Sequence, residues 1–511
     1  MNCLMGIDLG TSATKTQIFD DKGQVLVTAV AEYPVLTPKN GWNEQEPEAW
    51  KVACFKTVKQ VVAELKQRFN LGSESIKGIG ISGQMHGLVM LDKQGEVIRP
   101  AIIWSDQRTA QECVEITELV GEKRLLEITA NPALPGFTAS KILWVRKHEP
   151  ANYERCHKIL LPKDYLRFCL TGEFATEVSD ASGMQLLDVA NRCWSKEVLQ
   201  KLDIDAELLA PVYESPQVTS EVSVKVAELT GLRAGTPVVG GAGDNAAAAV
   251  GTGVVTEGRA FTTIGSSGVV FAHTDSMKLD PQGRVHTFCC AVPGAWHCMG
   301  VTQAAGLSYK WFKEQFCSLE EQQAKSSNTS VYEILNQLAS TAPIGSNRLL
   351  YLPYLNGERT PHLDAECRGV FFGLSSMHQK SDLVRAVLEG VSFSQLDCLN
   401  IMRDMDLQID DMLVTGGGAS DFWRQMLADV YNCEVSSLRA NEGPALGVAL
   451  LAGVGTGVYS SVQEACAVAV HKGETSKPTS EAHQRYMDFY RLYRALYPNL
   501  KTCWQELAKL G

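Results

Sequence analysis

The chain has 511 residues, of which 45% are hydrophobic and 21% are charged, and its formal net charge is −11. A chain of this length exceeds the size of one compact core and predicts two large lobes, between which a cleft can form. The acidic balance argues against a broad surface for nucleic acid or for an anionic membrane, since both need clustered Lys and Arg. An anionic ligand therefore requires a local site.

The sequence contains no apolar run that approaches the length of a membrane-spanning helix, about 18 residues, and its N-terminus lacks the basic region of a secretory signal. The 15 cysteines are scattered and none stands in a CxxC pair, so neither a zinc ribbon nor a disulfide scaffold is indicated. We interpret the cysteines as reduced, mostly buried thiols and expect a cytoplasmic protein.

The first part of the chain alternates apolar runs with turn residues, a pattern that is typical of strands. We expect strands at 3–9, 14–19 and 24–29, an amphipathic segment at 47–69 and a strand at 76–82. The first three strands form a meander, because no crossover helix separates them.

Two further strands are predicted at 88–92 and 97–104. A helix is expected to follow them, with Ser105 and Asp106 as candidate N-caps. The region from 107 to 235 is expected to be mainly helical, with breaks at its prolines.

A second strand-rich block begins at residue 237 and repeats the opening order of strand, small-residue turn and strand. Its expected elements are strands at 260–264 and 269–273, helices at 330–339 and 380–404, a strand at 412–415, a helix from Asp421 and a long helix at 481–510. Two such starts, about 240 residues apart, are typical of a duplicated two-lobe protein. We place an N-terminal lobe at 1–245, a C-terminal lobe at 246–455 and a helical segment at 456–511.

Three turns rich in glycine and hydroxyl side chains follow apolar strands, at 8–12, 265–268 and 416–420. Glycine lets the backbone approach a phosphate closely, and Ser and Thr hydroxyls add hydrogen-bond donors. A plain tight turn explains each one alone, but the three together favour a nucleotide bound across two lobes. The P-loop pattern GxxxxGK[ST] does not occur in the sequence.

A dinucleotide-binding motif is a weaker reading of residues 241–246, which fit GxGxxG/A after a strand. Such a fold requires a full helix and an acidic residue about 20 positions further on. Here Gly251 and Gly253 interrupt the helix, and position 264 is Ile. The sequence therefore argues against this fold.

Asp8 ends the first strand beside the turn formed by Gly10, Thr11 and Ser12. A bare carboxylate at this position would repel a phosphate, so we expect Asp8 to hold Mg²⁺, which bridges carboxylates to phosphate oxygens. The alternative is an Asp that caps its own turn. Lys15 on the returning strand either neutralises a phosphate oxygen or faces solvent.

Asp244 stands where a strand of small residues ends and a run of alanines begins. The glycines around it leave room for a ligand. A hydroxyl that attacks a γ-phosphate needs a base within hydrogen-bond reach, and the carboxylate of Asp244 can accept that proton. The alternative is a helix N-cap.

Two strand ends carry the mixture of polar and aromatic groups that binds a polyol. Gln84, Met85 and His86 lie between two glycines after one strand, and Trp104 and Asp106 follow the next. A satisfied core histidine explains His86 equally well. An interior Trp followed by a helix cap is the alternative for the second group.

With these features taken together, the sequence resembles the FGGY carbohydrate kinase family over nearly its whole length. The similarity rests on motifs at 6–12, 83–87, 100–104, 161–166, 243–246, 357–361 and 416–419, the last ahead of 423–425. Within the family, the Gln-Met-His-Gly element indicates D-xylulose as the acceptor.

The resemblance implies an α/β fold of two ribonuclease-H-like, actin-type ATPase lobes that close on ligands, with the sugar in the cleft and ATP bound mainly by the second lobe. The resemblance likewise implies that Asp244 is the catalytic base for attack of the sugar's terminal hydroxyl on the γ-phosphorus of ATP. The sugar contacts would include Met85, His86 and Asn245, and Asp8 would serve the metal.

The resemblance also implies that two turns bind the nucleotide. One contains Gly265 and Ser266, and the other contains Gly416 and Gly417. Some relatives carry Asn near the adenine where this chain has Asp421, so the contact with the base would differ here. The implied ligands are ATP, Mg²⁺ and a small sugar.

Other acceptors stay open as alternatives, namely ribulose, fuculose, gluconate and glycerol, as does a non-catalytic actin-like ATP switch. A switch would need a substrate domain after the second lobe, and a sugar sensor would need a DNA-binding segment before the first strand. The oligomeric state is open, with a homodimer among the options.

Overall fold

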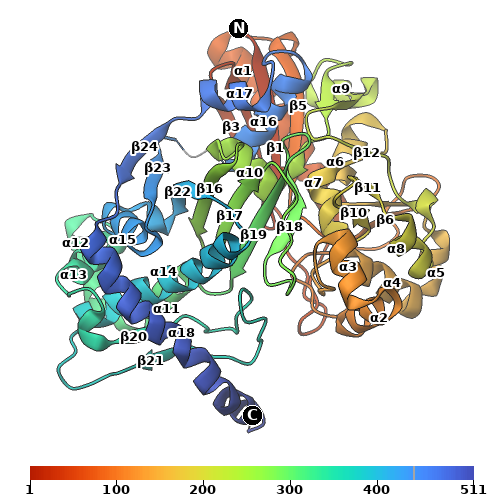
Figure 1. Cartoon of the computed structure of the whole chain (residues 1–511). Coiled ribbons are helices and arrows are strands. Elements are labelled where there is room, and N and C mark those ends of the chain that lie inside the picture. Colours follow the sequence, from red (N-terminus) through yellow and green to blue (C-terminus); the bar gives the residue numbers. More distant parts are fainter. Residues whose placement is uncertain (441–442, 511) are drawn as a thin grey trace.

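The computed structural model describes residues 1–440 and 443–510 of the chain. Two mixed sheets of seven strands each form the cores of two lobes, and a helical region extends from the first of them (Figure 1). This arrangement confirms the predicted two-lobe α/β fold.

The first sheet has the spatial order β13-β14-β5-β1-β2-β3. Its strands are β1 (Cys3–Leu9), β2 (Ala13–Asp20), β3 (Val25–Glu32), β5 (Ile76–Gly83), β13 (Val218–Glu221) and β14 (Pro237–Val239), with β15 (Ala242–Gly243) also paired to β5. β1, β2 and β3 form the predicted antiparallel meander, and β5 and β14 add in parallel. Helix α1 (Pro47–Phe69) buries one face against β2 and β3.

The second sheet repeats this design in the order β18-β19-β17-β16-β22-β23-β24. Its strands are β16 (Gly258–Ile264), β17 (Gly268–Thr274), β18 (His286–Cys289), β19 (Trp296–Thr302), β22 (Ile409–Gly416), β23 (Glu434–Leu438) and β24 (Lys472–Ser476). β16 pairs with β17 in an antiparallel and with β22 in a parallel direction, as β1 does with β2 and β5. Helix α14 (Lys380–Asp404) is buried along most of its length in this lobe.

Two helices join the lobes at one end. α10 (Asp244–Thr252) packs on α16 (Gly443–Gly455), and α16 in turn packs on β1 and β5 of the first sheet. Glycine allows this close approach, because a Cβ atom at Gly6 would lie 1.9 Å from the carbonyl oxygen of Ala445. A segment from late in the chain thus completes the first lobe.

The helical region beside the first sheet contains α2 (Ala110–Val120), α3 (Glu122–Thr129), α4 (Thr138–His148), α5 (Pro150–Arg155), α6 (Pro162–Thr171) and the shorter α7 (Val178–Ala181), α8 (Lys196–Lys201) and α9 (Val224–Thr230). Short strands β6 (Val89–Leu91), β7 (Ala101–Ile102) and β8 (Lys158–Leu160) also belong to it. The predicted helix start at Ser105 or Asp106 is wrong. The helix begins at Ala110 with Thr109 as its N-cap residue, and Asp106 instead forms an ion pair with Arg108.

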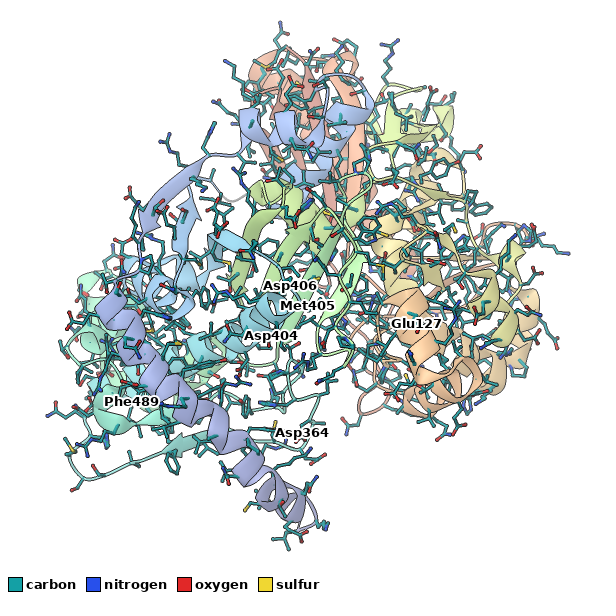
Figure 2. The ribbon with its side chains drawn as sticks, in the orientation of Figure 1. Glu127, Asp364, Asp404, Met405, Asp406 and Phe489 are labelled. Atoms are coloured by element: carbon teal, nitrogen blue, oxygen red, sulfur yellow. The ribbon has the colours of Figure 1, made fainter. Side chains whose placement is uncertain are left out.

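The second lobe is completed by α11 (Gly306–Phe316), α12 (Ser318–Ser327), α13 (Val331–Ser340) and α15 (Asp421–Tyr431), whereas α17 (Val462–Ala469) packs on α16 and α10. The last helix, α18 (Ser480–Ala508), carries Phe489 and runs past Asp364 toward the C-terminus (Figure 2). All 15 cysteines are free, and only Cys193 and Cys503 are exposed. Across residues 1–440 and 443–510, no helix has the length and apolar character needed to cross a membrane.

Candidate functional site

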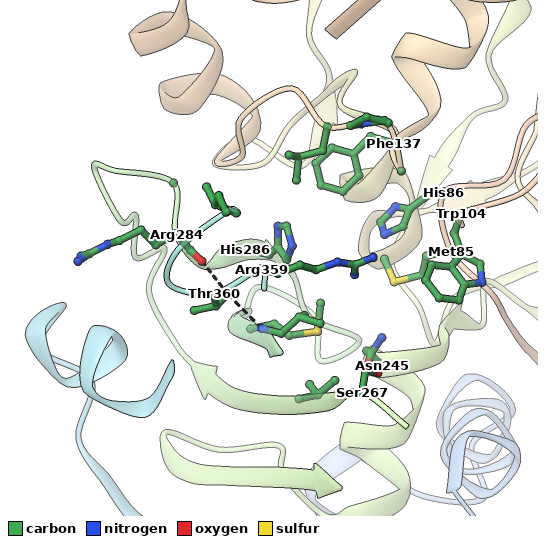
Figure 3. A pocket seen from close by; sticks show the side chains of 18 of the residues that line it. Met85, His86, Trp104, Phe137, Asn245, Ser267, Arg284, His286, Arg359 and Thr360 are labelled. Atoms are coloured by element: carbon green, nitrogen blue, oxygen red, sulfur yellow. Dashed lines mark hydrogen bonds between the residues drawn. The ribbon is translucent and has the colours of Figure 1, made fainter. Parts of the chain in front are cut away.

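A cavity of about 400 Å³ lies between the lobes, and we call it the central cavity (Figure 3). The first lobe supplies one wall and the second lobe the other, with the start of α10 between them. Its lining includes Met85, His86, Trp104, Gln107, Phe137, Asp244, Asn245, Ser267, Arg284, His286, Met299, Arg359 and Thr360.

Strand pairing brings the two predicted catalytic carboxylates to one edge of the first sheet. β1 and β15 both run parallel to β5, with Asp8 opposite Ser82 and Gly243 opposite Gly83. Asp244 follows Gly243 directly and begins α10. The backbone here is tightly enclosed, because a Cβ atom on Gly243 would lie 2.9 Å from the side chain of Met85. Glycine at this position therefore leaves the space that Met85 occupies in the cavity wall.

The environment of Asp244 suits a proton acceptor. Its Oδ1 accepts hydrogen bonds from the backbone N–H of Asn245 at 2.8 Å and from the Asn245 side chain at 3.0 Å. Burial, and then the charge of Asp8, raise the pKa of Asp244 to about 7. The N-cap of α10 is Gly243, so Asp244 does not serve as the conventional cap that was the alternative.

Asp8 presents a carboxylate oxygen that is buried and has no hydrogen-bond partner among the described residues. Burial raises the pKa of this carboxyl above its usual value. An unpartnered carboxylate oxygen, electrostatically coupled to a second carboxylate, fits a hard cation such as Mg²⁺, which takes one or two protein carboxylates and completes its shell with water and phosphate. Lys15 lies opposite Asp8 in the pairing of β1 with β2.

The turn at Gly10, Thr11 and Ser12 joins β1 to β2 and is connected to the central cavity. Gly10 donates its N–H to the carbonyl oxygen of Ala13 at 3.0 Å. The indole N–H of Trp104 donates to the hydroxyl of Thr11 at 3.0 Å. Trp104 is 36% exposed and lines the cavity, so it is not the interior Trp of the alternative interpretation.

The two glycine turns of the second lobe leave the same edge of its sheet. Gly416 lies opposite Ile264, the residue before Gly265, in the parallel pairing of β16 with β22. Gly265, Ser266, Gly416 and Gly417 are exposed. Gly416 has φ of 73°, and a Cβ atom there would lie 2.5 Å from the carbonyl oxygen of Ile264. This conformation explains why glycine occupies the position.

Asp421 begins α15 directly after the second of these turns. Its side chain is 92% exposed and forms an ion pair with Arg424 at 3.0 Å. The carboxylate therefore lies at the rim of this sheet edge, with the guanidinium of Arg424 beside it.

His86 lies in the cavity wall in a constrained conformation. Its φ is 67°, and its Nδ1 lies 3.0 Å from the carbonyl oxygen of Gly183. Burial lowers the pKa of His86 to about 3, so the ring is neutral at physiological pH. A carbonyl only accepts hydrogen bonds, so Nδ1 donates and Nε2 is left as the acceptor of the ring. Such an acceptor suits a sugar hydroxyl.

Two predicted sugar contacts lie outside the cavity lining. Gln84 is buried and donates to the side chain of Gln45 at 2.8 Å. Asp106 is buried and accepts a forked pair of bonds from Arg108 at 2.7–3.0 Å. In this structure both side chains bond to neighbouring residues of the wall, and Trp104 and Gln107 are the residues near Asp106 that line the cavity.

The structure adds cavity residues that carried no predicted role. Phe137 packs against His86 with ring centroids 4.9 Å apart, and His286 stacks on Phe288 at 5.6 Å. Arg359 belongs to the 357–361 motif that had signalled the family, whereas Phe137 and His286 had no local sequence signal. Long-range packing alone brings these two to the site.

The chain matches two family descriptions: the FGGY family of carbohydrate kinases, N-terminal domain, over residues 3–251, and the C-terminal domain of the same family over residues 260–456. Xylulose kinase from Lactococcus lactis is 40% identical over 514 residues, covering 100% of this chain and 99% of that protein. Xylulose kinase from Bacillus subtilis is 38% identical over 502 residues, covering 98% of both. The crystal structure of xylulose kinase from Rhodospirillum rubrum has a TM-score of 0.89 at 27% identity, covering 99% of this chain and 100% of that one.

Proposed function

We propose that this chain, which belongs to the FGGY family of carbohydrate kinases and is thus an ATP-dependent sugar kinase, transfers the γ-phosphate of ATP to D-xylulose. The observation that carries the choice of acceptor is the full-length similarity, at 38% and 40% identity, to proteins named xylulose kinase. The central cavity supports it, since it combines apolar and polar walls in the way of a small-polyol site. The product would be D-xylulose 5-phosphate.

In the proposed mechanism, Asp244 accepts the proton of the terminal hydroxyl as that oxygen attacks the γ-phosphorus in line. A carboxylate held by Asn245, with a pKa near 7, is basic enough to accept a proton yet largely ionised above neutrality. General base catalysis of this kind contributes about 10²–10⁴-fold, and positioning of the two substrates supplies much of the rest.

Asp8 would hold Mg²⁺, which supplies charge stabilisation for the transferred phosphoryl group when it is bound. The Gly10–Ser12 turn and the Gly265–Ser266 and Gly416–Gly417 turns would bind phosphate through backbone N–H groups and hydroxyls. Their positions at the carboxylate-bearing edge of one sheet and at the matching edge of the other support this assignment.

The proposed division of labour follows the lobes. The first lobe, residues 1–245, would bind the sugar through Met85, His86 and Trp104, with Asn245 beside the base. The second lobe, residues 246–455, would bind most of the nucleotide. Closure of the lobes would exclude the water that competes with the sugar as acceptor. A cytoplasmic location, where ATP is available, fits this activity.

The test is an ADP-release assay with Mg-ATP over a panel of D-xylulose, D-ribulose, L-fuculose, glycerol and gluconate. We expect strong turnover with D-xylulose and weak turnover with the others. Preference for another panel member would contradict D-xylulose as the acceptor but would leave the assignment of the chain as a kinase unchanged. Absence of turnover with every sugar would contradict the proposed function and favour an ATP-driven switch.

A further inference from the structure

Arg359 brings an unpaired positive charge from the second lobe into the central cavity. Its backbone N–H donates to Glu358 at 2.8 Å, but within residues 1–440 and 443–510 its guanidinium makes no hydrogen bond and no ion pair. In Figure 3 its side chain extends from beside His286 toward His86. The other arginine of the lining, Arg284, is bound to Asp280 by two bonds of 2.8 and 3.0 Å. Arg359 alone of these two is free to bind a ligand.

The backbone of Arg359 is rigidly mounted. The carboxyl of Glu358 accepts N–H bonds from Gln303 at 2.7 Å and from Arg359 itself, and it receives the hydroxyl of Ser394 at 3.3 Å. On the other side, Thr360 donates its N–H to the carbonyl oxygen of Val301 at 2.9 Å. A side chain on a fixed backbone loses less entropy when it binds a ligand.

The C-terminal helix fixes the same loop from outside. The ring of Tyr497 on α18 stacks on His362 with centroids 3.5 Å apart, and its hydroxyl bonds to Asp364 at 2.8 Å. Figure 2 shows Asp364 beside the C-terminal half of α18. The loop that carries Arg359 is thus held against both the second sheet and the last helix.

Among the described residues, Glu358 is the acidic group that acts on the charge of Arg359. Burial raises the pKa of Glu358 to about 8, so this carboxyl is mostly neutral at pH 7. His86 and His286 are neutral as well, because burial lowers the pKa of His86 to about 3 and that of His286 to about 4. Burial also lowers the pKa of Arg359, but a guanidinium stays charged in proteins. A desolvated donor group in such a cavity requires an oxygen-rich ligand.

We infer that Arg359 binds the acceptor sugar, donating hydrogen bonds from the second lobe to oxygen atoms of a ligand whose other side lies on Met85, His86 and Trp104. A guanidinium has five N–H donors and no acceptor, so it matches the carbonyl and hydroxyl oxygens of a polyhydroxy ketose. This inference rests on the proposed function. It adds a specificity-determining contact on the lobe opposite to the sugar-binding wall.

A consequence is that the sugar itself links the two lobes. Its contacts with His86 and Trp104 lie on the first lobe, and its contact with Arg359 lies on the second. Binding energy from Arg359 is realised only when the lobes are close enough for both contacts. Sugar binding therefore favours the closed arrangement.

The experiment compares the full-length wild type with Arg359→Met and Arg359→Lys. A hydrogen bond to a charged group corresponds to roughly a 10- to 100-fold change in affinity, so Arg359→Met should raise KM and Kd for D-xylulose by about this factor. Arg359→Lys should recover part of the lost sugar affinity, because Lys keeps the positive charge but has fewer hydrogen-bond donors than Arg. The Kd of ATP, measured by calorimetry, should change less than about threefold.

Arg368→Met is the matched control. This arginine lies in the same loop, but its guanidinium bonds to the carbonyl oxygens of Ala365 and Cys367 and it does not line the cavity. Its sugar KM should stay at the wild-type value. If Arg359→Met folds, as judged by its melting temperature and its Kd for ATP, and keeps the wild-type Kd for the sugar, the inference is wrong while the proposed function stands.

If the wild type phosphorylates another sugar of the panel, the variants are compared with that sugar instead. An unchanged Kd for that sugar in Arg359→Met would again overturn the inference. A wild type that phosphorylates none of the panel would contradict the proposed function, and the inference with it. The wild-type assay thus tests the proposed function, and the ratio of the sugar Kd in Arg359→Met to that in the wild type tests the role of Arg359.

Discussion

The two lobes share one sheet design but differ in the residue two positions before the turn glycine. In the first lobe this residue is Asp8, which lies opposite Ser82 on the neighbouring parallel strand. In the second lobe it is Thr263, whose hydroxyl lies 2.8 Å from that of Thr415 on the matching strand. One sheet edge therefore carries a buried carboxyl group and the other a neutral hydroxyl pair.

This difference suits the proposed binding of one nucleotide between the two edges. A carboxylate on both edges would surround the phosphates with negative charge, whereas a carboxylate on one edge suits a single cation. Asp244 lies beside the charged edge, where the first lobe passes into α10. In the proposed mechanism, this asymmetry would place the metal and the base on the side of the sugar and leave the second edge for the nucleotide.

The largest effect is expected when the base beside the charged edge is removed. Asp244→Asn keeps the size of the side chain but not its basicity, so kcat should fall by about 10²–10⁴-fold. Sugar affinity should change only modestly. An ADP-release assay and calorimetry measure the two quantities, and near-normal turnover in this variant would refute the assignment of the base.

Asp8→Asn would make the first edge neutral like the second. We expect kcat to fall on the order of 10²-fold, because charge stabilisation at the phosphoryl group is lost. The Mg²⁺ concentration needed for half-maximal activity should rise. A titration with MgCl₂ at fixed ATP measures it, and an unchanged Mg²⁺ dependence would remove Asp8 from the metal site.

Thr263→Asp would instead charge the second edge like the first. A like charge near the phosphates should raise KM for ATP on the order of tenfold, with little effect on KM for the sugar. Thr263→Asn, which is polar but neutral, is the control. Equal KM values for ATP in both variants would show that the neutrality of this edge is unimportant.

Trp104→Phe tests the connection between the first turn and the cavity. The variant keeps an aromatic wall but loses the N–H bond to Thr11, which corresponds to about 1 kcal/mol, or a fivefold change in KM for the sugar.

Asp421→Asn at the rim of the second edge should change KM for ATP less than about threefold, since its carboxylate is exposed. We therefore expect the change in KM for ATP in Asp421→Asn to be smaller than the change in KM for the sugar in Trp104→Phe. The opposite order would contradict this expectation.

Local sequence pattern predicted the elements whose boundaries depend on their own residues. β1 at Cys3–Leu9 and α14 at Lys380–Asp404 have the predicted bounds, because apolar runs there end at strong turn or capping residues. The same pattern failed at Asp106, where an ion pair with Arg108 replaces the expected helix cap. A pairing between two side chains leaves no trace in hydrophobic periodicity.

The position of a candidate residue was predictable where it lies near the end of a strand, as Asp8 does, or directly after one, as Asp244 does. It was not predictable where contacts from distant segments decide the position. Phe137 and His286 reach the cavity from segments far apart in the chain, and α16 reaches the first sheet through the close approach at Gly6. Such contacts depend on tertiary packing, which a single sequence does not encode locally.

The most direct test of Asp244 as the base is the dependence of wild-type kcat/KM for D-xylulose on pH. The raised pKa of Asp244 means that its carboxyl gains a proton as the pH falls through about 7, and a protonated carboxyl cannot accept the proton of the sugar hydroxyl. We predict that kcat/KM falls about tenfold per pH unit below an apparent pKa at or below this value. A kcat/KM that stays constant from about pH 8 to pH 5 would contradict the account.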